Sequence, residues 1–284
     1  MAWTTLSVLD WTTQRFTDAG IAAARLEAQL LLSHVLRCSR VQLYTAFDKP
    51  LAEAELAGYR ELIKRRLGGE PVAYLLGEQE FWALPFYVDA SVLVPRPDTE
   101  TVIEVARALR PDPAAPCRVL DLCTGSGAIA ISLAKELPGA RVIATEVSPE
   151  AAAVARRNAE RNEVADRVEV RAGDLFGPVA GERFDLIVSN PPYIATAVIA
   201  TLAAEVRREP LVALDGGPDG LAFYDRICAD ARAHLLPGGA IVLEHGYDQA
   251  DPVRARLEAA GFEQVTLVRD LGKNPRVTSG VAPA

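Results

Sequence analysis

Cysteine and histidine are scarce in this chain of 284 residues, which has four cysteines and three histidines. The cysteines show no CxxC spacing and no grouping with histidine, and they stand at Cys38, Cys117, Cys123 and Cys228. Zinc sites and disulfide frameworks need such grouping. We therefore expect reduced, mostly buried thiols and no metal centre.

Long apolar runs are absent as well, since no segment approaches the roughly 18 apolar residues that cross a bilayer. The first residues, Met-Ala-Trp-Thr-Thr-Leu, show no basic region followed by an apolar stretch, so the pattern of a secretory signal is missing. The hydrophobic content is 50% and the charged content 24%, which is a normal globular mixture. We expect a cytoplasmic protein without a membrane partner.

Positive charge is in deficit, with a formal net charge of −8. Proteins that bind duplex DNA or structural RNA usually carry a basic face, because phosphate neutralisation supplies much of the affinity. We interpret two short basic runs, at 64–66 and 207–208, as solvated ends of helices. The charge balance disfavours a polynucleotide substrate, and we expect no direct nucleic-acid partner.

The first seventy or so residues are dominated by helical periodicity. We predict helices at 3–17, 22–37 and 52–67, the last of which ends at a pair of glycines. Trp3 and Trp11 are interpreted as part of the core of this bundle. Residues 1–70 are therefore predicted to form a small helical domain.

Aromatic and β-branched residues then gather in a connecting segment, 71–97, which is typical of short strands or a hairpin. Phe81, Trp82 and Phe86 are interpreted as the core of this hairpin linker. In the segment that follows, Asp98 or Thr99 is suited to cap a helix running to about residue 109.

Strands and helices alternate over the remaining residues, 98–284, and predict a doubly wound, Rossmann-like α/β domain with a parallel sheet. We expect strands at 118–122, 141–145, 168–171, 184–189, 240–244 and 264–268. We expect helices at 128–137, 149–162, 220–236 and 249–260. Residues 275–281 are predicted to add a final edge strand, with an antiparallel direction left open.

A glycine-rich turn follows the first of these strands, where Leu122 leads into Cys123-Thr124-Gly125-Ser126-Gly127 and a helix begins. Glycines permit positive φ and close approach of a ligand, while free N–H groups point outward from the helix start. Glu146 ends the next strand, 21 residues after Gly125, at a distance that suits a ribose diol. This pattern also fits the dinucleotide fingerprint, so it does not choose between a nicotinamide and another adenosine cofactor.

Two further strand ends complete the predicted site. Asp174 and Leu175 follow one strand and would lie near an adenine ring. Another strand ends in Asn190-Pro191-Pro192-Tyr193, at the carboxyl edge where open α/β sheets bind ligands. The prolines fix the backbone and remove donors, which leaves the Asn190 side-chain oxygen and the Pro191 carbonyl as acceptors beside Tyr193. Two such acceptors would orient a planar amide or amine and stabilise positive charge on its nitrogen during methyl transfer.

Taken together, these segments resemble the release-factor glutamine methyltransferase family, often called HemK or PrmC. The resemblance covers nearly the whole chain and rests on motifs in a fixed order: Gly69–Leu75, Glu80–Trp82, Val94–Glu100, Asp121–Gly127, Gly173–Phe176, Ser189–Ile194, Glu209-Pro210, Asp219–Leu221, Pro237–Gly239 and Glu244–Tyr247. The order and spacing of the set make it specific, above all the segments at 69–82 and 94–100, which generic methyltransferases lack.

The resemblance implies that residues 1–70 recognise class I peptide-chain release factors and that residues 98–284 bind S-adenosyl-L-methionine. The substrate would be the glutamine of the Gly-Gly-Gln loop, methylated on its side-chain amide nitrogen. The implied cofactor-binding residues are Cys123, Thr124, Gly125, Ser126, Gly127, Glu146, Asp174, Leu175 and Asn190. The implied catalytic residues are Asn190, Pro191 and Tyr193, and with Pro192 they would hold the glutamine amide.

Cys123 departs from the family pattern, because it stands where the family usually has the first glycine of the turn. If this position needs a positive φ, we expect impaired cofactor binding; if φ is negative, a small thiol should fit. Two other functions remain open. One is N-methylation of a nucleic-acid amine, where related turns also occur, and the other is cofactor binding without catalysis.

Overall fold

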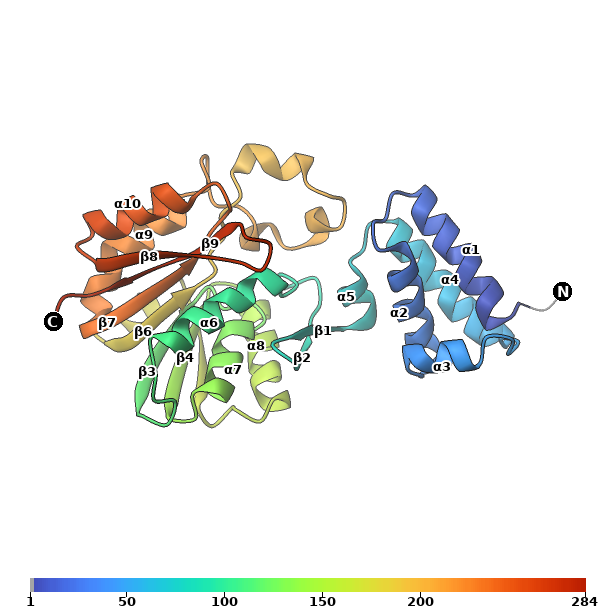
Figure 1. Ribbon diagram of the computed structural model, residues 1–284, viewed down its shortest axis with the longest axis horizontal. Coiled ribbons are helices and arrows are strands. Elements are labelled where there is room, and N and C mark those ends of the chain that lie inside the picture. The colour runs from blue at the N-terminus through green and yellow to red at the C-terminus, as the bar shows by residue number, and fades with distance from the viewer. Residues whose placement is uncertain (1–2) are drawn as a thin grey trace. The chain divides into compact units, whose positions relative to one another are not determined.

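The computed structural model describes residues 3–284, which fold into two compact units (Figure 1). The first, here the N-terminal unit, comprises the chain up to Gly77 together with residues 203–208. The second, here the sheet unit, comprises residues 78–202 and 209–284. No helix within residues 3–284 has both the length and the apolar character needed to cross a membrane.

The N-terminal unit is a helical bundle, as predicted. Its helices are α1 (Thr5–Asp18), α2 (Ala24–Leu36), α3 (Arg40–Thr45), α4 (Glu53–Leu67) and α5 (Val72–Leu76). Phe16 and Leu31 are fully buried in its core, and the buried Tyr59 hydroxyl donates a hydrogen bond of 2.8 Å to the Ala28 carbonyl. Burial of such side chains, at roughly 2 kcal/mol each, is the main stabilising term for a bundle of this size.

Two sequence interpretations in this unit are wrong. Trp3 and Trp11 are 40% and 50% exposed and stack edge to face on each other instead of entering the core, which the smaller side chains of α1 fill. Arg66 is not a solvated helix end, because it is only 6% exposed. Its guanidinium forms ion pairs of 2.6 Å with Glu27 and 2.5 Å with Glu205, and this pairing makes its burial tolerable.

The sheet unit is a seven-stranded sheet in the order β5-β4-β3-β6-β7-β9-β8, preceded by a two-stranded hairpin. The strands are β1 (Glu78–Phe81), β2 (Leu84–Tyr87), β3 (Cys117–Leu122), β4 (Ala140–Glu146), β5 (Val168–Ala172), β6 (Phe184–Ser189), β7 (Leu235–Glu244), β8 (Glu263–Arg269) and β9 (Pro275–Val281). The helices are α6 (Glu100–Ala108), α7 (Ala128–Glu136), α8 (Pro149–Arg161), α9 (Ala222–Ala231) and α10 (Ala250–Ala259). Short 3-10 helices lie in the sheet unit at Pro97–Thr99, Gly177–Val179, Thr196–Thr201, Leu211–Ala213 and Arg232–His234, and another, Val206–Arg208, belongs to the N-terminal unit.

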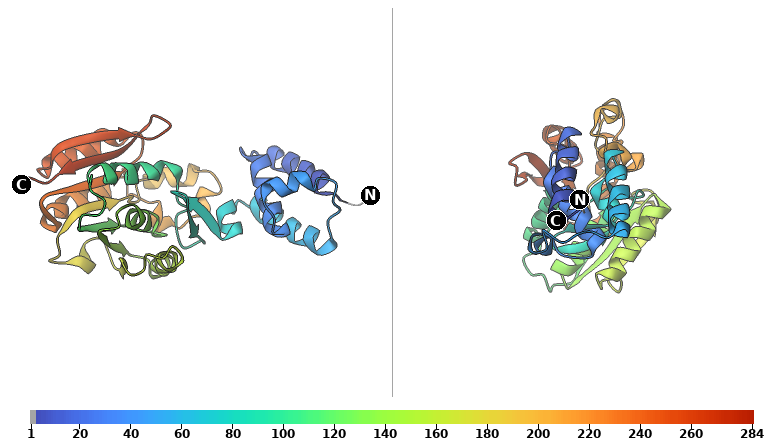
Figure 2. Two further views of the ribbon diagram at one scale, coloured as in Figure 1. Left: turned by 60° about the horizontal axis from the view of Figure 1, so that its bottom comes forward. Right: turned by 90° about the vertical axis from the view of Figure 1, so that its right-hand side faces the viewer.

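Helices cover both faces of the sheet, which confirms the predicted doubly wound class (Figures 1 and 2). One apolar cluster joins the strands to α6, α7 and α8, and a second joins the opposite face to α9 and α10. The strands from β5 to β7 are parallel, so their carboxyl ends lie at one edge. Ligands of open α/β sheets bind at that edge.

Two strand predictions need correction. β9 is antiparallel, but it lies between β7 and β8 and pairs with both, so β8 is the edge strand. The helix predicted at 220–236 ends as α9 at Ala231, because β7 already begins at Leu235, which pairs with Phe184. A register irregularity next to this pair accommodates the Pro237-Gly238-Gly239 segment inside the strand.

The aromatic hairpin forms as predicted with Phe81 and Phe86 in its core, whereas Trp82, predicted for the same core, is only half-buried. Phe81 and Phe86 are at most 2% exposed, and their rings meet edge to face at 6.1 Å between centroids. Trp82 and Ala83 form the turn with φ of 51° and 54°, the geometry of a two-residue hairpin loop. The Tyr87 N–H donates to the Asn158 side chain at 2.7 Å, which fixes the hairpin against α8.

Candidate active site

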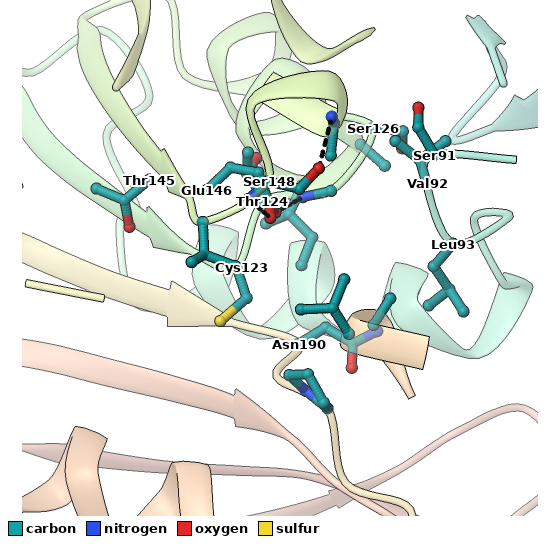
Figure 3. Close-up of a pocket in the computed structure, with 18 of the residues that line it drawn as sticks. Ser91, Val92, Leu93, Cys123, Thr124, Ser126, Thr145, Glu146, Ser148 and Asn190 are labelled. Atoms are coloured by element: carbon teal, nitrogen blue, oxygen red, sulfur yellow. Dashed lines mark hydrogen bonds between the residues drawn. The ribbon is translucent and has the colours of Figure 1, made fainter. Parts of the chain in front are cut away.

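An open cavity with about 900 Å³ of empty space, part of it solvent, lies in the sheet unit at the carboxyl ends of β3, β4, β5 and β6 (Figure 3). Residues from four predicted motifs line it: Cys123, Thr124, Gly125 and Ser126 from the glycine turn, Glu146, then Asp174 and Leu175, and Asn190 with Pro192. Gly127, Pro191 and Tyr193 lie outside this lining. The fold therefore brings together sequence segments that are up to 69 residues apart.

The glycine turn is shaped by two positive φ angles, 54° at Gly125 and 83° at Gly127. A Cβ built on Gly125 would meet no atom within 4 Å, so this backbone faces open space in the cavity. A Cβ on Gly127 would come within 2.9 Å of Ile131 and 3.3 Å of Ala155. The first glycine leaves room for a ligand, and the second permits close packing of α7 on α8.

Cys123 also has a positive φ, 59°, which side chains other than glycine seldom adopt. The condition under which we expect impaired cofactor binding is thus met. Its half-buried thiol lies in the lining of the cavity, and Figure 3 shows its sulfur on the side of Asn190. Burial, with the negative charge of Glu146 nearby, raises the pKa of this thiol, so it stays protonated at neutral pH.

Glu146 is 7% exposed and links β4 to the glycine turn. One carboxylate oxygen accepts a hydrogen bond of 2.9 Å from the Gly125 N–H, and the other accepts one of 3.0 Å from the Ser148 N–H. Each oxygen keeps a further lone pair, which can accept from a hydroxyl in the cavity. This geometry suits the predicted contact with a ribose diol.

The β5 end contributes two very different side chains. Leu175 is 6% exposed, with φ of 44°, and offers an apolar wall. Asp174 is exposed and forms an ion pair with Arg226 at the rim. An apolar wall beside a carboxylate suits a flat nitrogen heterocycle such as adenine, and the contact of this turn with adenine stays a prediction.

Asn190 follows β6 directly and is held by a residue from a distant motif. Its Nδ2 donates a hydrogen bond of 3.2 Å to the hydroxyl of Thr99, which occupies the predicted cap position before α6. The Thr99 side chain makes no capping bond to the helix backbone. The capping motif was recognised in the sequence, but its second use, in fixing Asn190, was not.

The exit from the Asn-Pro-Pro-Tyr turn is held by hydrogen bonds to the segment that follows the 3-10 helix Leu211–Ala213. The Ile194 N–H donates to the Leu214 carbonyl at 3.0 Å, and the Gly216 N–H donates back to the Ile194 carbonyl at 2.8 Å. Gln249 Nε2 donates to the Tyr193 carbonyl at 2.9 Å. A Cβ on Gly220 would lie 2.4 Å from that carbonyl oxygen, so only glycine fits there. The turn is rigid before any ligand binds.

Several residues of the lining were not identified from the sequence as site residues. They are Ser91, Val92, Leu93, Pro95, Arg96, Thr99, Ala128, Ile129, Thr145, Val147, Ser148, Ala151, Gly173, Val212, Ala213 and Phe223. Arg96 forms an ion pair with Glu209, whose side chain is 1% exposed, and this pairing fixes a positive charge at the cavity. Pro95, Arg96 and Thr99 belong to the Val94–Glu100 motif, which supports the family resemblance and supplies a helix cap but was not predicted to line the site.

Two buried carboxyl groups flank the site. Asp121, at the end of β3, is 0% exposed, and Glu244, at the end of β7, is 1% exposed. Burial raises the pKa of each to about 7, against hydrogen bonds that favour the charged form. In each carboxyl group one oxygen, Asp121 Oδ1 and Glu244 Oε2, has no hydrogen-bond partner among the described residues, 3–284.

His245 is fully buried, and both of its ring nitrogens are hydrogen-bonded within the protein. Nδ1 lies 2.8 Å from the Gly246 carbonyl and Nε2 lies 2.9 Å from the Thr278 hydroxyl. Burial lowers the pKa of the ring, so it is neutral at pH 7. The ring is not part of the cavity lining, so within this unit it joins β7 to β9 through its bond to Thr278.

Two family descriptions match separate parts of the chain. "PrmC N-terminal domain" matches residues 7–77, and "Methyltransferase small domain" matches residues 105–208. The first range covers the helical bundle, and the second covers the glycine turn, Glu146 and Asn190.

Curated relatives match over nearly their full length. A release factor glutamine methyltransferase from Geobacter sulfurreducens is 48% identical over 279 residues, which cover 98% of this chain and 96% of that protein. One from Bordetella pertussis is 48% identical over 257 residues, covering 90% and 94% respectively. The crystal structure of a methyltransferase from Pyrococcus furiosus matches with a TM-score of 0.53 at 23% identity, covering 78% of this chain and 98% of that chain. This last likeness shows the fold.

Proposed function

The chain belongs to the release factor glutamine methyltransferase family, and from this membership we propose that it methylates the side-chain amide nitrogen of a release-factor glutamine, with S-adenosylmethionine as the methyl donor. The substrate would be the glutamine of the Gly-Gly-Gln loop in class I peptide-chain release factors. These factors act on translating ribosomes, so the enzyme would meet its substrate in the cytoplasm.

The observation that carries this proposal is the placement of Asn190. It stands in the lining of the cavity that also contains the glycine turn, and its Nδ2 is already engaged by Thr99. Its Oδ1 can therefore accept a hydrogen bond from an N–H group of the glutamine amide. The Pro191 carbonyl is proposed as the second acceptor, because the two prolines leave no competing donor in the turn.

These acceptors serve a nucleophile that is weak for a known reason. The nitrogen lone pair of an amide is delocalised into its carbonyl group, so positive charge grows on nitrogen as a new bond forms. Acceptors fixed before the reaction stabilise this charge and hold the nitrogen in line with the donor. Because the turn is clamped beyond Tyr193, little reorganisation is needed during the reaction. Tyr193 packs behind the turn, and its predicted direct contact with the amide stays a prediction.

S-adenosylmethionine, when bound, supplies a methyl group on a sulfonium, which is a good leaving group. The fit of this chain to it rests on three features: the open space in front of Gly125, the remaining acceptor capacity of Glu146, and the apolar wall formed by Leu175. The first suits the methionine part, the second the ribose and the third the adenine. Thr124, Ser126 and Gly127 complete the proposed contacts.

The N-terminal unit is proposed to recognise the release factor outside the methylated loop. A three-residue loop offers little area compared with the roughly 800 Å² per partner of a stable protein interface. Trp3 and Trp11 are half exposed on this unit and provide the kind of aromatic surface that protein interfaces favour. The sheet unit would then receive the loop.

The test is transfer of label from S-adenosylmethionine to a purified class I release factor. We expect label in the intact factor, no label in a factor whose loop glutamine is replaced, and none in duplex DNA. Label in DNA would instead support methylation of a nucleic-acid amine. Absence of label from all three, with cofactor binding confirmed, would contradict the proposal.

A further inference from the structure

We propose that Asn158 is a positioning residue for the cofactor, because its buried side-chain amide joins the glycine turn to the end of the hairpin. In this way it fixes two walls of the cavity against each other on the side that receives the methionine part of S-adenosylmethionine. This role rests on the proposed function in one respect, since it takes S-adenosylmethionine as the ligand of the cavity.

The Asn158 side chain is 0% exposed and makes three hydrogen bonds to backbone groups. Its Oδ1 accepts one of 2.7 Å from the Tyr87 N–H, and its Nδ2 donates one of 2.9 Å to the Tyr87 carbonyl and one of 2.9 Å to the Ser126 carbonyl. The nitrogen of a side-chain amide carries two donors, so both are used. The reverse orientation would place Oδ1 against two carbonyl oxygens, and the backbone therefore fixes the direction of the amide.

The two partners of this amide belong to different walls of the cavity. Ser126 lines the cavity as part of the glycine turn. Tyr87 ends β2, and the chain runs on from there to residues 91–93, which also line the cavity (Figure 3). One amide thus holds the turn and the start of the second wall at a fixed separation. A ligand that contacts both walls depends on that separation.

Asn158 reaches both partners because of its place on α8. It shares one face of this helix with Ala151 and Ala155, which precede it at helical spacing. Ala151 lines the cavity, and Ala155 packs behind the glycine turn, where a Cβ on Gly127 would lie 3.3 Å from the Ala155 Cβ. The helix backbone is held by its own hydrogen bonds, so the amide starts from a rigid support.

The glycine turn has a second support, which acts on another part of the proposed ligand. The Gly125 N–H donates to Glu146 at 2.9 Å, and Glu146 is the proposed partner of the ribose. Leu175, the proposed wall for the adenine, follows β5. Neither contact runs through Asn158. Loss of the Asn158 amide should therefore weaken binding of the methionine part and leave binding of the adenosine part in place.

The experiment is calorimetric titration of wild type and Asn158→Ala with S-adenosylmethionine and with 5′-methylthioadenosine, which keeps the adenosine and the sulfur but lacks the amino-acid part. We expect Asn158→Ala to bind S-adenosylmethionine about ten-fold more weakly, as for the loss of a buried hydrogen-bonding group. Its affinity for 5′-methylthioadenosine should stay within about two-fold of wild type. Equal losses for the two ligands, or no loss for S-adenosylmethionine, would overturn the proposal.

Asn162→Ala is the matched control. Asn162 directly follows α8 and is 5% exposed, and its Nδ2 donates at 3.0 Å to the Pro85 carbonyl of the hairpin and at 3.0 Å to the Asn158 carbonyl. Its replacement removes a buried amide and a hairpin contact but no bond to the glycine turn. We expect a lower Tm in both variants, whereas Asn162→Ala should change either affinity by no more than about two-fold. A loss of S-adenosylmethionine affinity in Asn162→Ala as large as in Asn158→Ala would refute the specific role of Asn158.

A second measurement uses the wild type alone and holds even if Asn158→Ala does not fold. If the amide couples the two walls, S-adenosylmethionine bound at the glycine turn should slow hydrogen exchange of the Tyr87 N–H by about five-fold or more. Binding of 5′-methylthioadenosine should slow it less. An exchange rate of the Tyr87 N–H that S-adenosylmethionine leaves unchanged would refute the coupling.

Release-factor methylation separates this role from the proposed function. Asn158→Ala should raise KM for S-adenosylmethionine about ten-fold and retain kcat within about three-fold, because the acceptors of the Asn190 turn are unchanged. An enzyme in which Asn158→Ala weakens only S-adenosylmethionine, but which methylates no glutamine, would refute the proposed function and leave the role of Asn158 standing. A wild type that binds no S-adenosylmethionine would refute both.

Discussion

The two edges of the cavity each contain one buried carboxylate, and the two groups are held in different ways. Asp121 accepts from the Thr124 hydroxyl at 2.5 Å and from the Ala130 N–H at 3.2 Å, both within nine residues along the chain. Glu244 is 1% exposed at the end of β7, and its Oε2 has no hydrogen-bond partner within residues 3–284. The first carboxylate organises a local loop through hydrogen bonds, whereas the second is buried beside a different strand.

This comparison explains which edge serves which part of the reaction. A loop that is fixed by local bonds can form early and is suited to bind a cofactor of constant shape. An amide acceptor must instead be aligned against a nucleophile that arrives from another protein, and remote side chains provide the restraint. The two edges should therefore respond differently to substitution, in affinity on the Asp121 side and in turnover on the Asn190 side.

The largest effect is expected for Asn190→Ala, which removes the acceptor at the reacting nitrogen. By analogy with the loss of one fixed hydrogen-bonding group at a reaction centre, kcat should fall about 100- to 1000-fold. The affinity for S-adenosylmethionine should remain within a few-fold, because the glycine turn and Glu146 are unchanged. Single-turnover methylation and calorimetric binding measure the two quantities.

If Asn190→Ala lowers kcat and the affinity for S-adenosylmethionine by the same factor, the Asp121 and Asn190 sides of the cavity do not differ in function. Unchanged turnover would contradict the mechanism and favour a protein that binds the cofactor without catalysis. Asn162→Ala, in which a buried asparagine outside the cavity lining is replaced, serves as the control for loss of a buried amide.

The same difference in sequence separation decides what could be predicted from the sequence. Cys123 to Gly127 and Asn190 to Tyr193 could be proposed from the sequence because each motif is contiguous, and the alternation of strand and helix patterns predicted the fold class. The link from Thr99 to Asn190 spans 91 residues, and nothing local in either motif requires it. Local patterns specify the strands and turns, whereas the side chains that meet across strands are decided by strand order.

Strand order itself was only partly predictable. Residues 275–281 have the alternation of a strand, but insertion of β9 between β7 and β8 depends on pairing partners on both sides. The prediction that Trp3 and Trp11 lie in the bundle core was wrong for a related reason. Helical spacing shows which residues share a face of a helix, but it does not show whether that face contacts the core or the solvent.

A smaller effect, on stability, is expected for Asp121→Asn. Burial raises the pKa of Asp121 from 3.8 to about 7, so the folded protein holds a proton that the unfolded chain releases between these values. The free energy of unfolding of the wild type should therefore fall as the pH rises from about 4 to about 7. Asp121→Asn has no such proton, and between pH 4 and 8 it should gain about 4 kcal/mol relative to wild type, the equivalent of a pKa change of about three units.

Urea unfolding of wild type and Asp121→Asn at about pH 4 and about pH 8 measures this difference in stability. The ionisation of Glu244 contributes equally to both proteins, so it cancels. If the difference in stability between wild type and Asp121→Asn is constant across this pH range, Asp121 is ionised in the folded protein. Asp121 and Glu244 would then also differ in their charge state. At either pH the affinity of Asp121→Asn for S-adenosylmethionine should fall by more than its kcat, which is the reverse of the result for Asn190→Ala.

The smallest effect concerns Cys123, which starts the turn on the Asp121 side. Its φ of 59° costs a residue with a Cβ about 1 kcal/mol, which glycine does not incur. Cys123→Gly and Cys123→Ala both remove the thiol, so their difference isolates the backbone term. We expect Cys123→Gly to be more stable than Cys123→Ala by about 1 kcal/mol, whereas in a helix interior alanine is the more stable residue by a similar amount.

If strain in the turn also weakens cofactor binding, Cys123→Gly should bind S-adenosylmethionine more tightly than the wild type by about five-fold, the equivalent of 1 kcal/mol. Equal affinity would show that the strain is present before and after binding and affects only folding. A more stable alanine variant would mean that the turn adopts a negative φ, and the cofactor edge would then accept a side chain at this position without cost.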